Sequence, residues 1–341
     1  MRAGGLRSRE KRSGTRWILL AVALGSALAG PTQAPAQAPI RMFRIGYLLL
    51  PPLAADPTAE RAAFLDGLRE RHLIVGRTFI VEYRSANWNG PMLDALAQEL
   101  AQLKVDVLFA PGTQAALAAR RATATIPIVT TAIADPVGSG LVKSLARPGG
   151  NVTGIAMVSN ELGAKRLELL REAVPHARTI AVLRNPTHAV TEYEYASMQE
   201  AARVLGVTLQ PVAVGSAEDF ARALDALARQ KPDAVIAVLD PWMSAYREIL
   251  AEWQLKHGVP VSLGHREFAE AGGLMSYGPD ISDLYRRAAY HVSRVLRGAR
   301  PGELPFEPPV KFELVVNLKT ARALGLTIPG TLLLRATQVI E

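Results

Sequence analysis

Cysteine is absent from the 341 residues of this chain, and aromatic residues make up only 6% of it. The lack of cysteine excludes disulfide bonds, thiolate catalysis and anchoring through a lipidated cysteine. The folded chain must therefore be stabilised by core burial. Because 49% of its residues are hydrophobic and its length suits two domains, the chain can build sufficient cores.

Common catalytic and metal-binding signatures are also absent. The sequence contains no H-E-x-x-H, no G-x-S-x-G, no phosphate-binding G-x-x-x-x-G-K-[ST] and no dinucleotide-binding G-x-G-x-x-G. Its six histidines show no metal-ligand spacing. We therefore expect a protein that is not an enzyme, with no catalytic residue, no metal site and no cofactor.

The first 29 residues have the order of a secretory signal peptide. Basic residues come first, the apolar run 17–28 follows, and Ala27-Leu28-Ala29 fits a cleavage site. This run is too short to span a bilayer as a helix, which needs about 20 residues. Residues 30–41 are rich in Pro, Gln and Ala and are predicted to be a spacer. We expect a periplasmic protein, and the alternative is an uncleaved membrane anchor.

The net charge of +8 belongs largely to this N-terminal segment. Residues 1–29 hold six basic residues and one acidic residue, so the remainder carries only about +3. No basic stripe is present, which argues against a nucleic-acid partner.

Past the spacer, short apolar runs alternate with longer amphipathic segments, a pattern typical of parallel sheets flanked by helices. The pattern also repeats once along the chain, which predicts two similar Rossmann-like (flavodoxin-like) α/β lobes. Four pairs of segments match at an offset of about 130 residues: 44–52 with 179–187, 64–86 with 198–217, 96–116 with 224–245, and 124–136 with 257–268.

The last seventy residues do not form a third domain. They contain an apolar run, a helix from about Asp280 to Gly298, and a strand near 311–317. We expect the chain to cross three times between the lobes, with Met157, Asn160, Tyr277 and Asp280 at the hinge. The predicted N-terminal lobe is 42–157 plus 278–309. The predicted C-terminal lobe is 158–277 plus 310–341.

In an open parallel sheet, ligands bind at the carboxyl ends of the strands. The loops expected there predict one cleft between the lobes, which a small-molecule ligand would occupy. The candidate ligand-binding residues are Tyr47, Pro52, Gly112, Thr113, Gln114, Asp135, Pro136, Asn185, Thr187, His188, Asp240, Trp242 and Arg266.

These residue types suit a small polar ligand. Thr113 and Gln114 follow Gly112 at a predicted helix start, where free N–H groups attract an anion, and Asn185 is expected to act similarly. Asp135 and Asp240 are candidates to neutralise an amine. The alternative is that such residues only cap helices. Two interpretations stay open for Tyr47 and Trp242, which either stack on a ligand or pack in a core. Arg266 is expected either to reach the cleft or to pair with an acidic residue on the surface. Residues 137–143 are interpreted as a turn entering a helix.

Several segments together resemble the family of ABC-transporter substrate-binding proteins that includes tryptophan- and tyrosine-type receptors. They are "FRIGYLLL", "DVLFAPGTQAALAARRATATIPIV", "ADPVGSGLVKSLARPGGNVTGI", "KRLELLREAVP", "GGLMSYGPD" and "NLKTARALGL". The resemblance covers residues 43–330. It implies a type I periplasmic-binding fold with three hinge strands, and permease and ATPase subunits as partners.

The combined interpretation is an exported receptor, expected to be a monomer, that closes on a small polar ligand such as an amino acid. A sensor of the same fold, feeding a chemoreceptor or a kinase, stays open as an alternative. An enzyme would need a nucleophile and base that the predicted loops do not offer. A cytoplasmic repressor would need a helix-turn-helix before the first lobe.

Overall fold

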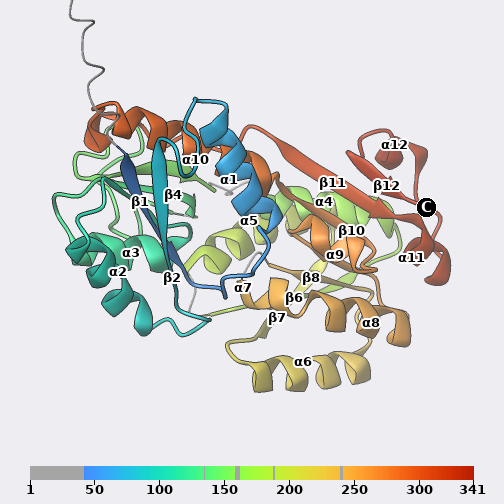
Figure 1. Cartoon of the computed structure of the whole chain (residues 1–341). Coiled ribbons are helices and arrows are strands. Elements are labelled where there is room, and N and C mark those ends of the chain that lie inside the picture. Colours follow the sequence, from blue (N-terminus) through green and yellow to red (C-terminus); the bar gives the residue numbers. More distant parts are fainter. Residues whose placement is uncertain (1–41, 134, 158–161, 187–188, 239–240) are drawn as a thin grey trace, which may run out of the picture. The chain divides into compact units, whose positions relative to one another are not determined.

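The computed structural model describes residues 42–341 except 134, 158–161, 187–188 and 239–240 (Figure 1). The predicted signal peptide and spacer lie outside the described residues. Among the described residues, none of the helices is long and apolar enough to cross a membrane.

The first sheet is built from the N-terminal strands. Its strand order within the described residues is β2-β1-β3-β4-β5, and every neighbouring pair is parallel. The strands are β1 (Phe43–Leu49), β2 (Phe79–Ser85), β3 (Val107–Phe109), β4 (Ile128–Ile133) and β5 (Val152–Ala156).

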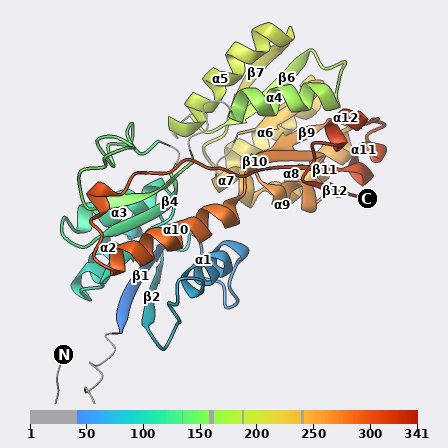
Figure 2. The ribbon, with the colours of Figure 1, turned by 90° about the horizontal axis from the view of Figure 1, so that it is seen from above.

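Helices cover both faces of this sheet because alternate strand residues point to opposite faces. On one face, Ile45 and Tyr47 pack against α1 and α10. On the other, Leu48 packs against α2 and α3. Both pairs of helices are seen in Figure 2. The helices are α1 (Ala59–Arg69), α2 (Met92–Gln102), α3 (Thr113–Ala122) and α10 (Ile281–Leu296).

The second sheet repeats the first order and extends it. Within the described residues it runs β12-β11-β10-β9-β8-β6-β7, so β6 to β10 follow the same order as β1 to β5. This confirms the two Rossmann-like units predicted from the internal repeat. The strands are β6 (Thr179–Arg184), β7 (Thr208–Ala213), β8 (Ala234–Ala237), β9 (Val261–Leu263), β10 (Met275–Pro279), β11 (Phe312–Asn317) and β12 (Gln338–Ile340).

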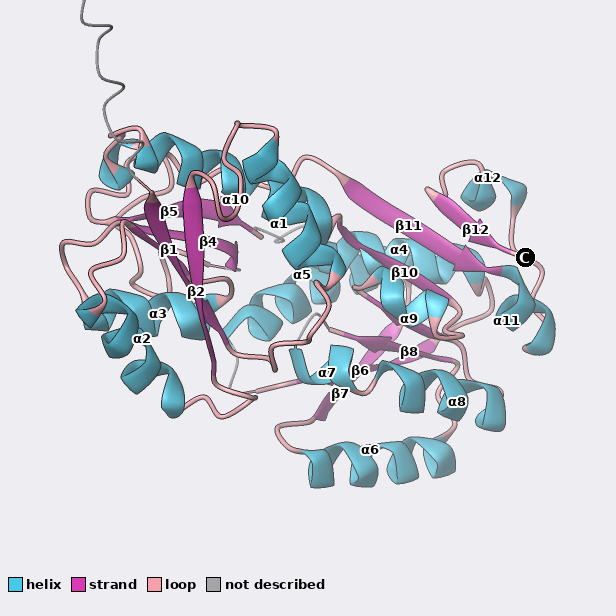
Figure 3. Cartoon of the chain, viewed as in Figure 1, coloured by secondary structure: helices cyan, strands magenta, loops and turns pink. Residues whose placement is uncertain are grey.

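One strand pair of the second sheet departs from the parallel arrangement. β10 and β11 are antiparallel, from Met275 opposite Val316 to Pro279 opposite Phe312 (Figure 3). Between them the chain leaves to form α10 and the 3-10 helix η1 (Pro301–Glu303), and it returns in the opposite direction.

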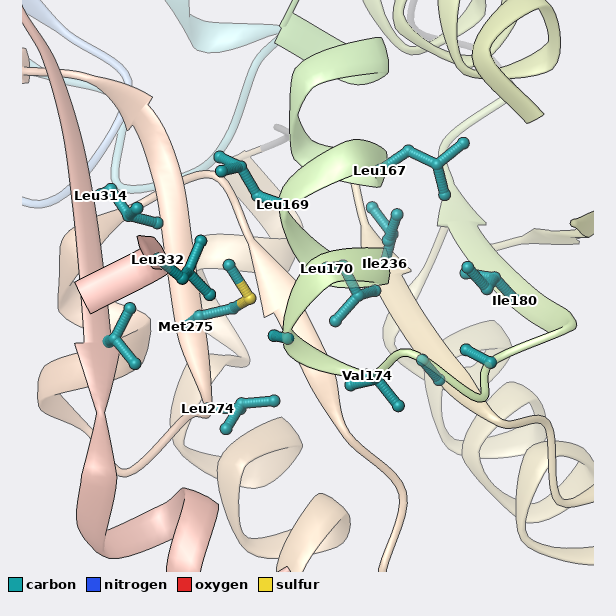
Figure 4. Close-up of a cluster of buried hydrophobic side chains, with 14 of the residues drawn as sticks. Leu167, Leu169, Leu170, Val174, Ile180, Ile236, Leu274, Met275, Leu314 and Leu332 are labelled. Carbon is teal, nitrogen blue, oxygen red and sulfur yellow. The ribbon is translucent and has the colours of Figure 1, made fainter. Parts of the chain in front are cut away.

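The second sheet is also covered on both faces. Figure 4 shows Leu167 and Leu170 of one covering helix near Ile180 and Ile236 of the sheet. Phe220, Trp253 and Phe268 pack on the other face. The helices of this half are α4 (Leu162–Ala173), α5 (Ala189–Leu205), α6 (Ala217–Gln230), α7 (Pro241–Ala245), α8 (Arg247–His257), α9 (Arg266–Glu270), α11 (Leu318–Ala323) and α12 (Gly330–Leu333).

Several helices begin where the sequence supplies a side-chain cap. Ser216 accepts a hydrogen bond from the Asp219 N–H at 3.1 Å at the start of α6, and Asp280 accepts one from the Asp283 N–H at 2.9 Å at the start of α10. Such caps satisfy N–H groups that a helix cannot pair internally. In contrast, residues 137–143 form turns and bends and do not enter a helix, which corrects that expectation.

Candidate functional site

The carboxyl ends of the first sheet carry a set of connected loops. The Trp88 N–H donates to the Leu50 carbonyl at 2.7 Å, which joins the loops after β2 and β1. The Gly112 N–H donates to the Thr131 carbonyl at 2.9 Å, which joins the loop after β3 to strand β4. These loops form a rim at the edge where a parallel sheet binds its ligand.

The helix start at Gly112 lies on this rim, as the sequence predicts. Gly112 has φ +85° and ψ 150°, a conformation that favours glycine. None of the described side chains caps α3, whose first residues are the half-buried Thr113 and the exposed Gln114. The first N–H groups of α3 are thus left for an acceptor such as a carboxylate. Simple side-chain capping does not account for this turn.

The end of β4 is irregular. The pairing of β4 with β5 shifts register between Thr130 and Ile133, and Ala132 between them has φ +56°. The buried Thr131 hydroxyl has no hydrogen-bond partner within the described part of the chain. β-bulges and non-glycine residues with a positive φ are enriched next to binding sites. The end of β4 is therefore a candidate binding site.

Asp135 and Pro136 follow that bulge. The Asp135 Oδ1 accepts hydrogen bonds from the Val137 N–H at 3.1 Å and the Gly138 N–H at 2.7 Å. Pro136 is buried beside it. The Asp135 carboxylate therefore orders its own turn, while its predicted contact with a ligand amine stays a prediction.

The two candidates in β1 and in the loop after it have different surroundings. Tyr47 lies inside β1 with only 1% of its surface exposed, and its ring contacts Phe64, Tyr83 and Phe109. Burial raises the pKa of its hydroxyl well above the usual value. The structure thus makes Tyr47 a core residue, since its apolar face is already covered. Pro52 is exposed on the rim.

The carboxyl edge of the second sheet is described only in part. Asn185 directly follows β6, is buried, and accepts a hydrogen bond on its carbonyl from the Thr191 hydroxyl. Thr187, His188 and Asp240 lie outside the described residues, and so does the side chain of Trp242 in α7. Their predicted contacts with a ligand remain predictions.

Arg266 is engaged elsewhere. Its guanidinium donates to Glu270 at 3.1 Å, to Glu313 at 2.9 Å and to Gln338 at 2.6 Å. These partners belong to α9, β11 and β12, so Arg266 ties a helix to two strands. Three of the five N–H donors of its guanidinium are thus used, and the predicted contact of Arg266 with a ligand stays a prediction.

A buried polar cluster near this edge was not expected. Arg166 of α4 is fully buried, pairs with the buried Glu194 of α5, and donates from Nε to the Tyr277 carbonyl at 3.1 Å. Burial lowers the pKa of Arg166 to about 10. Burial, together with the nearby Arg166 charge, lowers the pKa of His265 to about 4, so its imidazole is neutral at pH 7. Arg166 and Glu194 occur in amphipathic segments, where a charged residue is normally expected on the solvent-exposed face.

Of the predicted hinge residues, Met157 directly follows β5, Tyr277 lies in β10 and Asp280 directly follows β10. The Met157 N–H donates to the Ile133 carbonyl, and Asn160 is outside the described residues. Tyr277 stacks on Phe312 at 6.1 Å between ring centroids. The Asp280 N–H donates to the Lys311 carbonyl at 3.0 Å, which links the second and third connecting segments. Their function as a hinge stays a prediction.

A groove of about 490 Å³ lies away from these loops. Gln98, Lys104, Thr123 and Thr125 are among the residues that line it, at the C-terminal ends of α2 and α3. It is therefore at the opposite end of these helices from Gly112. Among the described residues, no group of His, Asp or Glu side chains could hold a metal ion.

A type I periplasmic-binding fold with loops gathered at the carboxyl ends of two repeated sheets defines a class of ligand-binding receptors. The chain belongs to the family of ABC transporter substrate binding proteins, which matches residues 56–340. The model of this family describes binding proteins rather than enzymes.

Three relatives illustrate this membership. A tyrosine-binding protein of Clostridioides difficile (strain R20291) is 27% identical over 277 residues, covering 80% of this chain and 79% of that protein. A conserved domain protein from Vibrio cholerae is 30% identical with a TM-score of 0.81. An ABC domain from Streptococcus pneumonia, solved in complex with L-Trp, is 26% identical with a TM-score of 0.81. In both structural comparisons the match covers 88% of this chain and 100% of the other chain.

Proposed function

We propose that this chain is an exported receptor of an ABC importer that binds an amino acid with an aromatic side chain. Two relatives support this ligand class, one described as tyrosine-binding and one solved with L-Trp. In the proposal, residues 42–157 with 278–309 and residues 158–277 with 310–341 are two lobes. Ligand contacts to both lobes favour the closed state, which a membrane permease with its ATPase then recognises.

The observation that carries the proposal is the N-terminus of α3. Within the described part of the chain its first N–H groups have no side-chain cap, and Gly112 lets a ligand approach the backbone closely. The carboxylate of an amino acid fits this position. Its ammonium group needs an acidic partner, for which Asp135 and Asp240 are the candidates. The protein acts by binding and release and needs no catalytic group.

Thermal unfolding with a ligand panel tests the proposal. The purified protein is first unfolded and refolded to remove any co-purified ligand. It is then heated with L-Trp, L-Tyr, L-Phe, L-Leu, glucose and inositol. A ligand at 100 times its Kd stabilises the folded state by about 2.7 kcal/mol. We expect a rise in Tm with aromatic amino acids. A rise with a sugar alone, or no rise with any amino acid, would contradict the proposal.

A further inference from the structure

Trp88 is an exposed aromatic side chain on the rim of the first sheet. It lies in the loop between β2 and α2, and 51% of its surface is exposed. Trp88 is not among the ligand-binding residues predicted from the sequence. Isolated exposed apolar residues are common, so the position of Trp88 needs further support from its backbone and its neighbours.

The backbone of Trp88 is held in an unfavourable conformation. Asn87 has φ +48° and Trp88 has φ +65°, which places two successive residues in the left-handed region. Asparagine tolerates this region, but a bulky residue such as tryptophan rarely adopts it. Residues with such strain persist where the surroundings fix them, and they cluster at binding sites.

The loop is fixed by hydrogen bonds to its neighbour on the rim. Besides the bond from the Trp88 N–H to Leu50, the Ser85 hydroxyl donates to the Pro51 carbonyl at 2.8 Å. The Asn89 N–H donates to the Ala86 carbonyl at 2.8 Å and closes the turn. Trp88 is therefore presented by a rigid turn rather than by a loose loop.

The same loop lies against the helix start proposed to bind the ligand carboxylate. A Cβ added at Gly90 would lie 3.4 Å from Oε1 of Gln114, the second residue of α3. Trp88 precedes Gly90 by two residues. An exposed indole thus belongs to the loop that touches the N-terminal turn of α3, on the edge of the sheet where ligands bind.

We propose that the indole of Trp88 stacks on the side chain of the bound amino acid and selects aromatic over aliphatic ligands. The inference rests on the proposed function and adds the residue that determines its specificity. Aromatic rings gain from stacking beyond the area they bury, whereas an aliphatic side chain gains only the buried area. A large aromatic surface on a loop beside a carboxylate site suits an aromatic amino acid.

Substitution of Trp88 by asparagine separates binding from stability. Because asparagine tolerates a positive φ, Trp88→Asn relieves the strain, and its Tm is expected to equal or exceed that of the wild type. Affinity for L-Trp and L-Tyr is expected to fall by about tenfold or more, while affinity for L-Leu changes less than threefold. Trp88→Phe is expected to retain most of the preference for aromatic ligands.

Isothermal titration of the whole protein with these three amino acids measures the effect. Met92→Ala is the matched control, since Met92 is 43% exposed at the start of α2, shortly after the same loop. Loss of aromatic affinity in Trp88→Asn, with Met92→Ala unchanged, supports the inference. Equal affinities of wild type and Trp88→Asn for L-Trp overturn it and leave the proposed function standing. A wild type that binds no amino acid overturns both.

Discussion

Arg166 and Glu194 form an ion pair in which both side chains are almost completely buried, joining α4 to α5. The Nε of Arg166 also donates to the Tyr277 carbonyl of β10. Its Nη2 has no hydrogen-bond partner among the described residues. The pair therefore binds three elements of the second half together, at the cost of desolvating two charges.

Loss of one partner of this pair should destabilise the protein strongly. Arg166→Met leaves the Glu194 carboxylate buried, and the expected loss is about 3–5 kcal/mol in the free energy of unfolding. Urea denaturation measures it. The double variant Arg166→Met/Glu194→Leu removes both charges and should lose less than the single variant. Lys165→Met, on the same helix but in an exposed pair with Glu168, serves as the control.

The neutral imidazole of His265 predicts a loss of stability in acid. Its pKa is about 4 in the folded protein and 6.5 in an ordinary environment, so the unfolded state binds the proton more tightly. The contribution of His265 to the free energy of unfolding is therefore fully present above pH 6.5. It is lost as the pH decreases toward 4, by up to about 3 kcal/mol. Burial lowers the pKa of His291 as well, which adds a change of the same sign.

Urea denaturation between pH 4 and 7 checks this dependence. His265→Gln should flatten the decrease, because glutamine does not titrate. His176→Gln, a change at an exposed histidine, should leave the slope as it is in the wild type. An equally steep decrease in His265→Gln would exclude His265 as its source.

Thr113 is expected to contribute to binding but little to stability. It begins α3 without capping it, so Thr113→Ala should change Tm by less than about 2 °C, corresponding to a few tenths of a kcal/mol. Loss of one ligand hydrogen bond should weaken affinity by roughly tenfold. Titration with L-Trp measures this, with the exposed Thr125→Ala at the far end of the helix as control. Unchanged affinity in Thr113→Ala would remove the Thr113 hydroxyl from the site.

Arg266 should behave in the opposite way. Its three acceptors connect α9 to β11 and β12, so Arg266→Ala is expected to lower stability by about 1 kcal/mol. Its affinity for L-Trp should equal that of the wild type. A large loss of affinity at unchanged Tm would identify Arg266 as a residue that contacts the ligand.

The two sheets and their repetition are largely predictable from the sequence because they depend on local patterns. Buried parallel strands require short continuous apolar runs, and the repeated runs after 44–52 and 179–187 give the same strand order twice. The antiparallel return of β11 is not predictable in this way. It follows from where α10 and η1 direct the chain, which depends on tertiary packing.

The candidate site is less predictable because its contacts join distant residues. Tyr47 is of a residue type that often contacts ligands, yet three rings from other elements cover it. Arg266 likewise pairs with residues up to 72 positions away. Conversely, the exposure of Trp88 results from a left-handed turn, which neither residue type nor periodicity signals. The turn at Gly112 was predictable because glycine before a helix start is a local feature.

The antiparallel pairing of β10 with β11 has a mechanical consequence. The segments that leave these strands are joined by the Asp280–Lys311 backbone hydrogen bond and by the ion pair of Lys311 with Asp283 at 2.8 Å. Two strands bonded along their length bend easily out of plane but resist sliding past each other. We therefore expect two of the three connections between the sheets to act as one ribbon, so that any movement at this point would be flexing about a single axis.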